Sequence, residues 1–481
     1  MEGSEDAMPN PPEAQVKKRK PRNSAEFYRV QPVFDRRIHV LGLGSIGMFV
    51  AHSLRDTVNP PPVTLLFHKW SHLKEWREGA QQLKVLTNGI EEKQEGFDAE
   101  LALPRPRSHG KEIAHGYDQD DPSAEKPLAE GESNEPISSL IICTKATAVV
   151  SALSSIKHRL HKDSVIMFMQ NGMGIVEEVN ENLFPDPDTR PYYMLGINSH
   201  GVHRSLDNPF TVTHAGFGSI SFGLLPHERE RSSAPYLPTR KVAPHGAEWE
   251  PKHIATPDPD TPEPTSASVR WTPHHRYLIR TLLGAPVLCA TGFSPPDLLQ
   301  LQLEKLAANC IVNPLTVLLD SRNGSILYNY HITRTMRLLL SEISLVIRSL
   351  PELQYIPNVQ QRFDPGRLES TVVSVAQRTK DNISSMLADT RAGRPTEIDY
   401  INGWIVKKGE EQGVRCLTNY MLVNLVKGKN AMIQYEMRED VPLVEGAPTE
   451  ESGVILKDAI AGTVHAAQQV GSNNGLGHAE K

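Results

Sequence analysis

Three polar side chains recur at every fourth position of a mostly apolar stretch in this 481-residue chain. The stretch, 301–319, reads LQLEKLAANCIVNPLTVLL; the three positions are Lys305, Asn309 and Asn313, and Gln302 and Thr316 join the same face. In a helix, such positions lie along one face. A lysine ammonium can donate a proton to a carbonyl oxygen, and amides can bind a hydroxyl or carboxylate group. The same stripe would also suit the solvent-facing side of an ordinary amphipathic helix.

A glycine-rich turn near the start of the chain has the spacing of a cofactor site. HVLGLGSIGMF reads as a strand, a turn with the pattern G-x-G-x-x-G, and the start of a helix. The first glycine permits the tight turn, the second lets a pyrophosphate approach, and the third lets the helix pack on the strand. A second strand at 63–67 follows, so the pattern predicts a dinucleotide site. The expected cofactor-binding residues of the turn are Gly42, Leu43, Gly44, Ser45, Ile46 and Gly47.

The residues after the second predicted strand bear on the type of cofactor. A site for NAD favours Asp or Glu here, to hold the ribose hydroxyls. This chain has His68 and Lys69 instead. A cation suits a 2′-phosphate, which favours NADPH/NADP+, although Lys69 is also compatible with an ordinary surface lysine.

Two further strands end in polar residues. SSLIICTK ends at Lys145, and SVIMFMQN ends at Asn171. The alternation of strands and helices predicts a doubly wound, mostly parallel sheet. Ligands bind such sheets at the carboxyl ends of the strands, so Lys145 and Asn171 are expected beside the glycine turn. For each, the alternative is an ordinary polar loop residue.

Composition divides the chain into two folded regions, two tails and two insertions. Strand and helix patterns alternate in the first region, which a strand at 287–290 should close, whereas only helical patterns occur in the second. Stretches rich in charge, Pro and Gly predict flexible segments. The expected boundaries are a disordered tail 1–35, a Rossmann-type α/β domain 36–293 with flexible insertions at about 89–136 and 226–273, an all-α domain 294–436, and a disordered tail 437–481.

The second region carries two more candidate polar sites. Asn382 and Ser385 stand at i and i+3 in a predicted helix over 368–388. Another helix is expected to open with Thr396 as its N-cap and Glu397 in its first turn. Ser385 is equally compatible with an ordinary helical serine, and Glu397 with a carboxylate favoured by the helix dipole.

Several classes of protein do not fit the composition. The net charge of −6 and a pI of about 6.4 give no sign of nucleic-acid binding. No apolar run approaches the roughly 20 residues of a membrane helix. The N-terminus has early acids and no signal-peptide core, which favours the cytoplasm, with the mitochondrion as the alternative. No metal or disulfide spacing occurs, and buried free thiols are expected at Cys143, Cys289, Cys310 and Cys416.

Taken together, these residues indicate hydride transfer from a nicotinamide to a carbonyl carbon. The carbonyl oxygen then needs a cation and a proton, and Lys305 could supply both in a partly buried site.

The chain resembles the ketopantoate reductase (2-dehydropantoate 2-reductase) family. The resemblance spans about 36–432 and rests on HVLGLGSIGMF, IICTKA, QNGMG, KLAANCIVNPLT and NISSMLADTRAGRPTEIDYINGW, in the family's order. It implies NADPH-dependent reduction of ketopantoate to pantoate, in pantothenate and coenzyme A synthesis. It also implies a C-terminal helical domain like that of 6-phosphogluconate dehydrogenase. The insertions and tails resemble fungal members, and GINSHGVH matches the family only loosely.

The resemblance assigns roles to the candidate residues. Lys305 matches the catalytic lysine, and Glu397 the active-site glutamate, which would also contact the cofactor. The implied substrate contacts are Asn171, Asn309, Asn313 and Ser385, with Asn382 nearby. The implied cofactor contacts beyond the glycine turn are Lys145, Asn171 and either His68 or Lys69. The expected partner is a small 2-oxo acid, and the expected assembly is a monomer or homodimer. The alternatives are a related 2-oxo acid reductase and a non-catalytic NADP(H)-binding sensor.

Overall fold

The computed structural model describes residues 34–103, 107–108, 111–112, 130–205, 207–228 and 271–437. From Arg37 onward, the described residues form one compact unit. The tails, apart from 34–35 and 437, and the central parts of both expected insertions lie outside the described residues. The domain boundaries expected at 293 and 436 stay predictions.

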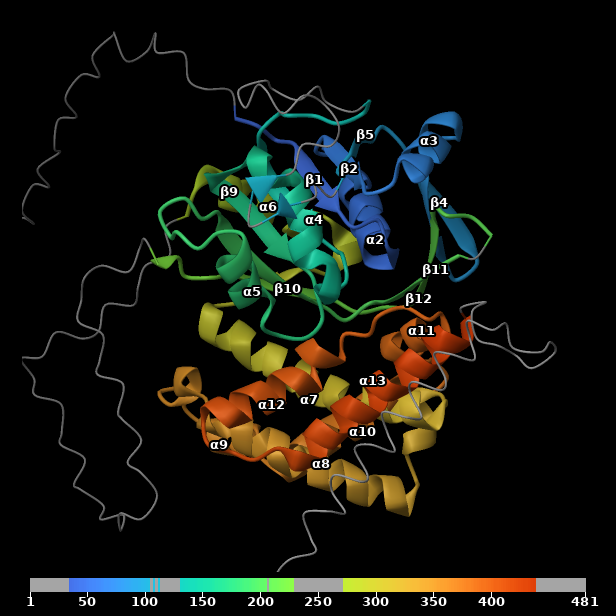
Figure 1. Ribbon diagram of the computed structural model, residues 1–481. Helices are drawn as coiled ribbons and strands as arrows, with labels where there is room; N and C mark the ends of the chain where they lie inside the picture. The colour runs from blue at the N-terminus through green and yellow to red at the C-terminus, as the bar shows by residue number, and fades with distance from the viewer. Residues whose placement is uncertain are drawn as a thin grey trace, which may run out of the picture. The chain divides into compact units, whose positions relative to one another are not determined.

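An eight-stranded sheet forms the centre of the first half of the chain (Figure 1). Its order is β14-β13-β10-β9-β8-β1-β2-β5, and every neighbouring pair is parallel except β10 and β13. This confirms the predicted doubly wound, mostly parallel sheet. The strands are β1 (Ile38–Leu41), β2 (Val63–Phe67), β5 (Asp98–Leu101), β8 (Ile137–Ile142), β9 (Leu160–Phe168), β10 (Tyr192–Asn198), β13 (Ile220–Leu224) and β14 (Thr291–Gly292).

Side chains of the central strands alternate between two apolar cores. On β9, Val165 and Met167 enter one core, whereas Ile166 and Phe168 enter the other. Strands that are apolar on both faces are buried between two layers of helices. The covering helices are α2 (Ser45–Arg55), α3 (Trp70–Glu78) and α6 (Pro273–Leu283) in the first core, and α4 (Val149–Ile156) and α5 (Ile175–Asn182) in the second.

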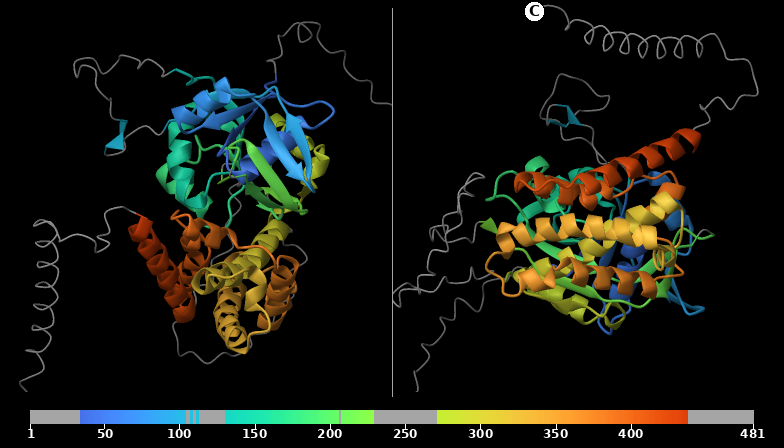
Figure 2. Two further views of the ribbon diagram at one scale, coloured as in Figure 1. Left: turned by 90° about the vertical axis from the view of Figure 1, so that its right-hand side faces the viewer. Right: turned by 90° about the horizontal axis from the view of Figure 1, so that it is seen from below.

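A second, four-stranded sheet packs on α2 and was not predicted (Figure 2). Its order is β11-β12-β3-β4, and β12 and β3 pair in parallel although 127 residues separate Leu86 from its register neighbour Thr213. Its strands are β3 (Leu83–Thr87), β4 (Ile90–Gln94), β11 (Gly201–Arg204) and β12 (Thr211–Gly216). A short hairpin of β6 (Arg107–Ser108) and β7 (Lys111–Glu112) is separate.

The expectation of a largely flexible insertion at about 89–136 is wrong for β4 and β5. β4 pairs with β3, and β5 extends the main sheet beside β2. The sequence of β4, IEEKQ, is almost entirely exposed, because β4 is an edge strand. Charged edge strands resist unwanted pairing and show no hydrophobic alternation, so composition alone makes such a strand look like a loop.

The second half of the chain is helical, with α7 at its centre, as predicted. α7 contacts α8, α10, α11 and α13 and supplies much of their shared core. The Ser294 side chain caps its first turn, and two prolines follow, as is common at helix N-termini. The helices are α7 (Pro295–Leu319), α8 (Tyr330–Ser349), α9 (Val359–Arg362), α10 (Pro365–Arg378), α11 (Ser385–Arg391), α12 (Asn402–Glu411) and α13 (Leu417–Met437).

Two predicted helices differ in the structure. The helix expected over 368–388 is broken, because the Ser384 side chain accepts from Leu387 N and starts a new helix there. Asn382 and Ser385 therefore do not share one continuous helix. Glu397 precedes a 3₁₀ turn at 398–400 and lies outside α12, and Thr396 does not cap a helix.

The segment at 286–289 also differs from expectation. A 3₁₀ turn, Pro286–Leu288, replaces the strand predicted at 287–290. Cys289 follows with a positive φ of 43°, which a strand cannot accommodate. Its thiol is exposed, so the prediction of four buried thiols is wrong here, although all four cysteines are free.

Candidate active site

Lys305 lies in the first half of α7 and is bound to two oxygens from the sheet region. Its Nζ donates to Asn171 Oδ1 at 2.9 Å and to the Asn198 backbone oxygen at 2.6 Å. The polar stripe therefore faces the sheet region at this position. Since an ammonium has three hydrogens, one remains for a further acceptor.

The environment of Lys305 makes its proton transferable. Burial lowers the pKa of Lys305 to about 8, and the negative charge of Glu397 partly opposes this. An acid with a pKa near the working pH is both protonated and able to release its proton.

Glu397 joins the helical region to two strand ends. Its side chain is 4% exposed. Oε1 accepts from Ala146 N at 2.9 Å, and Oε2 accepts from Asn171 Nδ2 at 3.5 Å. Asn171 itself is placed by Gln170, whose amide donates to Ile142 O at the end of β8. One carboxylate thus links the turns that follow β8 and β9.

Lys145, at the end of β8, forms an ion pair that sequence reasoning missed. Its Nζ lies 2.7 Å from Asp389 Oδ2 and 3.8 Å from Glu397 Oε2. Burial acts to lower the pKa of Lys145, but the two carboxylates outweigh it and raise the pKa. Asp389 is 3% exposed and also binds Arg394. The sequence signal that could have identified Asp389 is its position as an acid in the stretch SSMLADT, one helical turn after Ser385.

The two asparagines of the stripe have amides that are not used internally. Asn309 is partly buried and Asn313 is 7% exposed. Neither amide has a hydrogen-bond partner among the described residues. Both amides are therefore available to a substrate.

The structure separates the two other predicted substrate contacts. The Thr316 hydroxyl lies 2.7 Å from the Ser384 hydroxyl, which brings the start of α11, and hence Ser385, to α7. Asn382 lies in the exposed loop before α11, where its backbone oxygen accepts from Asn323 N. Its side chain makes no hydrogen bond to the residues that the structure describes, so nothing joins it to Lys305.

The glycine turn between β1 and α2 fits a pyrophosphate. Gly42 has a φ of +97°, and a Cβ there would lie 2.5 Å from Thr144 N. Gly44 faces open space, and a Cβ on Gly47 would overlap the Gly42 carbonyl oxygen. The first turn of α2 has neither a side-chain cap nor an acid, so its N–H groups can receive an anion. Leu43, Ser45 and Ile46 complete the turn and are partly buried.

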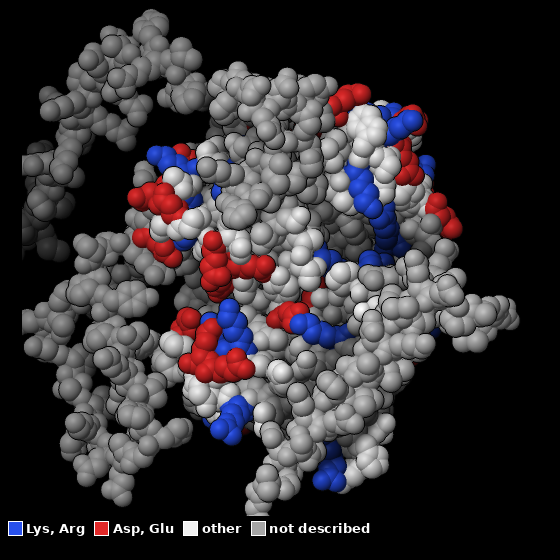
Figure 3. All heavy atoms as spheres, in the orientation of Figure 1, with Lys and Arg blue, Asp and Glu red and all other residues white. Residues whose placement is uncertain are grey.

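Cations gather after β2, where a 2′-phosphate is expected. Lys69 is exposed and precedes the first turn of α3. Burial lowers the pKa of His68, and the positive charges of Lys69, His72 and Arg204 lower it further. Arg204 comes from β11 and was missed, because it is distant in sequence. Figure 3 shows Lys and Arg side chains close together near α3 and β11.

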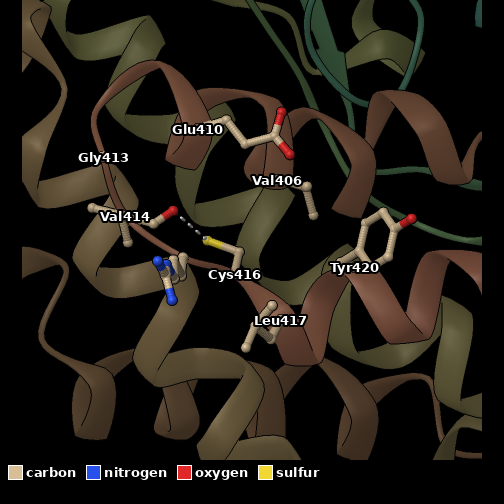
Figure 4. Close-up of a pocket in the computed structure, with 8 residues that line it drawn as sticks. Val406, Glu410, Gly413, Val414, Cys416, Leu417 and Tyr420 are labelled. Carbon is tan, nitrogen blue, oxygen red and sulfur yellow. Dashed lines mark hydrogen bonds between the residues drawn. The ribbon is translucent and has the colours of Figure 1, made fainter. Parts of the chain in front are cut away.

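A hollow of about 410 Å³ lies between α12 and α13 (Figure 4). Cys416 lines it, with its thiol donating to Val414 O, and burial raises the pKa of this thiol to about 11. A thiol with such a pKa is a poor nucleophile at neutral pH. None of the predicted site residues lines this hollow, which is formed by Val406, Glu410, Gly413, Val414, Arg415, Cys416, Leu417 and Tyr420.

Metal clusters and membrane-crossing helices are absent from the part of the chain that the structure describes. The described residues contain no group of three or more His, Cys, Asp or Glu side chains suited to a metal ion. Within the same ranges, no helix has the length and apolar character needed to cross a membrane.

Comparison with known proteins finds two family models that together match most of the chain. The model described as "Ketopantoate reductase PanE/ApbA" matches residues 38–227. The model described as "Ketopantoate reductase PanE/ApbA C terminal" matches residues 297–430.

Individual relatives agree with these matches. A "Probable 2-dehydropantoate 2-reductase" of Schizosaccharomyces pombe is 27% identical over 82% of this chain and 96% of its own length. A "Ketoisovalerate reductase BEA2" of Gibberella fujikuroi is 27% identical over 77% of this chain and 78% of its own length. A solved structure of D-mandelate dehydrogenase with NADH and anilino(oxo)acetate shares the fold, with a TM-score of 0.56, 19% identity, and coverage of 82% of this chain and 99% of that one.

Proposed function

This chain belongs to the ketopantoate reductase family, and on that premise we propose that it reduces 2-dehydropantoate (ketopantoate) to pantoate with NADPH. It is an oxidoreductase that uses a nicotinamide cofactor. The observation that carries the proposal is Lys305, whose ammonium is held by Asn171 Oδ1 and Asn198 O with one hydrogen left over.

The residues of the chain divide the work of the reaction. Bound NADPH would supply the hydride to the carbonyl carbon. Lys305 would donate its third hydrogen to the carbonyl oxygen as negative charge develops there, which completes the alcohol. Asn171 would hold the ammonium in place while Glu397 holds Asn171.

The stripe on α7 supports ketopantoate as the substrate. Ketopantoate carries a hydroxymethyl group that 2-oxoisovalerate lacks. The amides of Asn309 and Asn313 could bind its hydroxyl and the carboxylate, and a site built to bind a hydroxyl discriminates against a substrate without one. Ser385, at the start of α11, could add a further hydroxyl contact.

Residues on the sheet side would hold NADPH. The turn 42–47 would bind the pyrophosphate, and His68 or Lys69, with Arg204, would bind the 2′-phosphate. Lys145 follows the carboxyl end of β8, the strand beside β1, and would approach the cofactor from there.

A second candidate is a reductase of 2-oxoisovalerate. The Gibberella fujikuroi relative named for that substrate is as similar to this chain as the Schizosaccharomyces pombe relative. A non-catalytic NADP(H) sensor is less well supported, because it would not need Lys305, Asn309 and Asn313 in one stripe.

The test is NADPH oxidation followed at 340 nm with each substrate. We expect kcat/KM for ketopantoate to exceed that for 2-oxoisovalerate, and NADPH to be preferred over NADH. The reverse substrate order would favour the second candidate. Tight NADPH binding without oxidation by any 2-oxo acid would favour the sensor.

We also propose a cytoplasmic location, with the mitochondrion as the alternative. All four cysteines are free, which suits a reducing compartment. Microscopy of the fluorescently tagged full-length chain distinguishes the two.

A further inference from the structure

The carbonyl that accepts from Lys305 belongs to a tightly tethered turn between β10 and β11. Asn198 Nδ2 donates to His200 O at 3.2 Å, and His200 N donates to Asn198 Oδ1 at 3.3 Å. The Ser199 hydroxyl accepts from Ser219 N at 2.8 Å. Gly218 packs on this turn so closely that a Cβ would overlap the Ser199 carbonyl carbon. The turn therefore has little freedom to move away from Lys305.

Two buried histidines stand behind the turn, and their hydrogen bonds define their tautomers. His200 Nε2 lies 3.1 Å from Leu288 O, which can only accept, so Nε2 carries the hydrogen. His200 Nδ1 is then an acceptor. It receives Gly218 N–H at 3.1 Å and His214 Nε2–H at 3.1 Å.

This arrangement requires the His200 ring to be neutral. A proton on His200 Nδ1 would face two other donors, so both contacts would be lost. Burial lowers the pKa of both rings, and protonation of one would disfavour protonation of the other. The rings are 6% and 2% exposed and pack against Phe49 of α2, with ring centroids 5.1 and 4.7 Å away. The pair thus joins the turn to β12 and to the helix that follows the glycine turn.

We propose that His200 and His214 are positioning residues for the reduction, which hold the Asn198 carbonyl against the Lys305 ammonium. The proposal rests on the proposed function, because Lys305 is the proton donor there. Neither ring contacts the reacting atoms; each acts through the turn at 198–200.

The physical consequence falls on Lys305. An acceptor 2.6 Å from an ammonium stabilises its charged form. When the turn is loosened, the pKa of Lys305 falls further and its third hydrogen loses its direction. The negative charge of Glu397 raises the pKa of this ammonium, and a substitution at His214 leaves that charge in place. Loss of the positioning pair should therefore lower kcat and move its basic limb to lower pH.

The experiment is the pH profile of kcat for four proteins at saturating NADPH and 2-oxo acid. His214→Leu removes the donor to His200 and should lower kcat about tenfold, since small misplacements of catalytic groups are costly. Its basic limb should move down by about 0.5 pH unit, and KM should change less than about twofold. His214→Gln keeps an N–H donor and should restore kcat and the limb. His52→Gln is the matched control, because His52 is a buried histidine of α2 that bonds Glu92 O instead.

Ser199→Ala provides a second test if His214→Leu does not fold. Ser199 is exposed, and its substitution loosens the same turn without touching the buried rings. It should move the basic limb in the same direction. A basic limb identical to that of the parent chain in the folded variants would overturn the proposal, as would failure of a folded His214→Gln to recover.

Failure of the proposed function is separately visible. In that case the parent chain fails to oxidise NADPH with any of the 2-oxo acids tested. NMR titration of lysine labelled with ¹³C at Cε then measures the pKa of Lys305 directly, and an unchanged value in His214→Leu contradicts the positioning role.

Discussion

The Lys305 ammonium meets two oxygens of the sheet region, and these contacts set its direction. Asn171 Oδ1 and Asn198 O occupy two of its hydrogens. Burial brings its pKa to about 8, so the proton is present at neutral pH and is lost as the pH rises through 8. Its neighbours Asn309 and Asn313 offer amides on the same side of α7. Proton donation to the substrate therefore depends on the one hydrogen of the Lys305 ammonium that neither oxygen binds.

Replacing this cation should abolish turnover while leaving the cofactor site intact. For Lys305→Ala we expect kcat to fall by about 10²–10⁴-fold, the usual contribution of a positioned acid. The Kd for NADPH, measured by fluorescence titration, should change less than about twofold. The control is Lys427→Ala on α13, which removes an exposed ion pair between Lys427 and Asp399. Near-normal turnover of Lys305→Ala would contradict its role as the proton donor.

Cofactor preference should depend on the cations after β2. In Lys69→Ala we expect KM for NADPH to rise about tenfold, or ~1.4 kcal/mol, with little change for NADH, because only NADPH carries the 2′-phosphate. Lys74→Ala, on the exposed side of α3, is the matched control. Equal effects on both cofactors would show that Lys69 does not contact the 2′-phosphate.

At the scale of elements, the turn between β9 and α5 decides where Asn171 points. Gly172 has a φ of +82° and packs against the backbone of Tyr400. Met173 N donates to Tyr400 O at 2.8 Å, and the Tyr400 hydroxyl donates to Glu178 Oε2 at 2.7 Å. The 3₁₀ turn after Glu397 is therefore docked directly on the turn that carries Asn171.

Gly172→Ala should disturb this contact and, through it, catalysis. We expect the free energy of unfolding to fall by about 2 kcal/mol or more, from backbone strain and overlap with Tyr400. Gly89→Ala is the control, because Gly89 also has a positive φ, of +84°, but faces open space. It should cost about 1 kcal/mol or less. Urea denaturation measures both, and equal losses would mean that the contact with Tyr400 contributes nothing.

At the scale of the whole molecule, one ion pair joins regions that are far apart in sequence. Lys145 follows β8 of the sheet, and Asp389 lies on α11 of the helical region, 244 residues later. Arg394 holds the other oxygen of Asp389. The pair closes a chain of contacts that runs from Lys305 through Asn171 and Glu397 to Lys145.

Asp389→Asn should weaken the contact between the sheet and helical regions. Because Lys145 is half exposed and Glu397 remains nearby, we expect a loss of only about 1 kcal/mol in the free energy of unfolding. KM for NADPH should rise as well, since Lys145 would lose its direction. Asp320→Asn, which breaks the exposed pair with Arg391, is the control. A larger loss of stability in the control would contradict a special role for Asp389.

The sequence by itself determined the elements whose signals are local. The strand 63–67 was predicted with the boundaries that the structure shows, and the first strand was predicted directly before the glycine turn, where β1 lies. The helix that contains Lys305, Asn309 and Asn313 was equally clear from its period. Steric demands at Gly42 and Gly47 depend on residues close in the chain or on an adjacent strand, so the cofactor turn could be recognised without a structure.

Only the tertiary structure decided which groups meet these elements. Asn198 contributes a backbone oxygen, which leaves no mark in the sequence. Asp389 and Arg204 act on partners more than 100 residues away. Ser384 interrupts an apolar period that continues across it, and the exposed strand β4 has no hydrophobic alternation. Local periodicity records which side of an element is buried, whereas contacts between distant elements arise only when packing places their surfaces together.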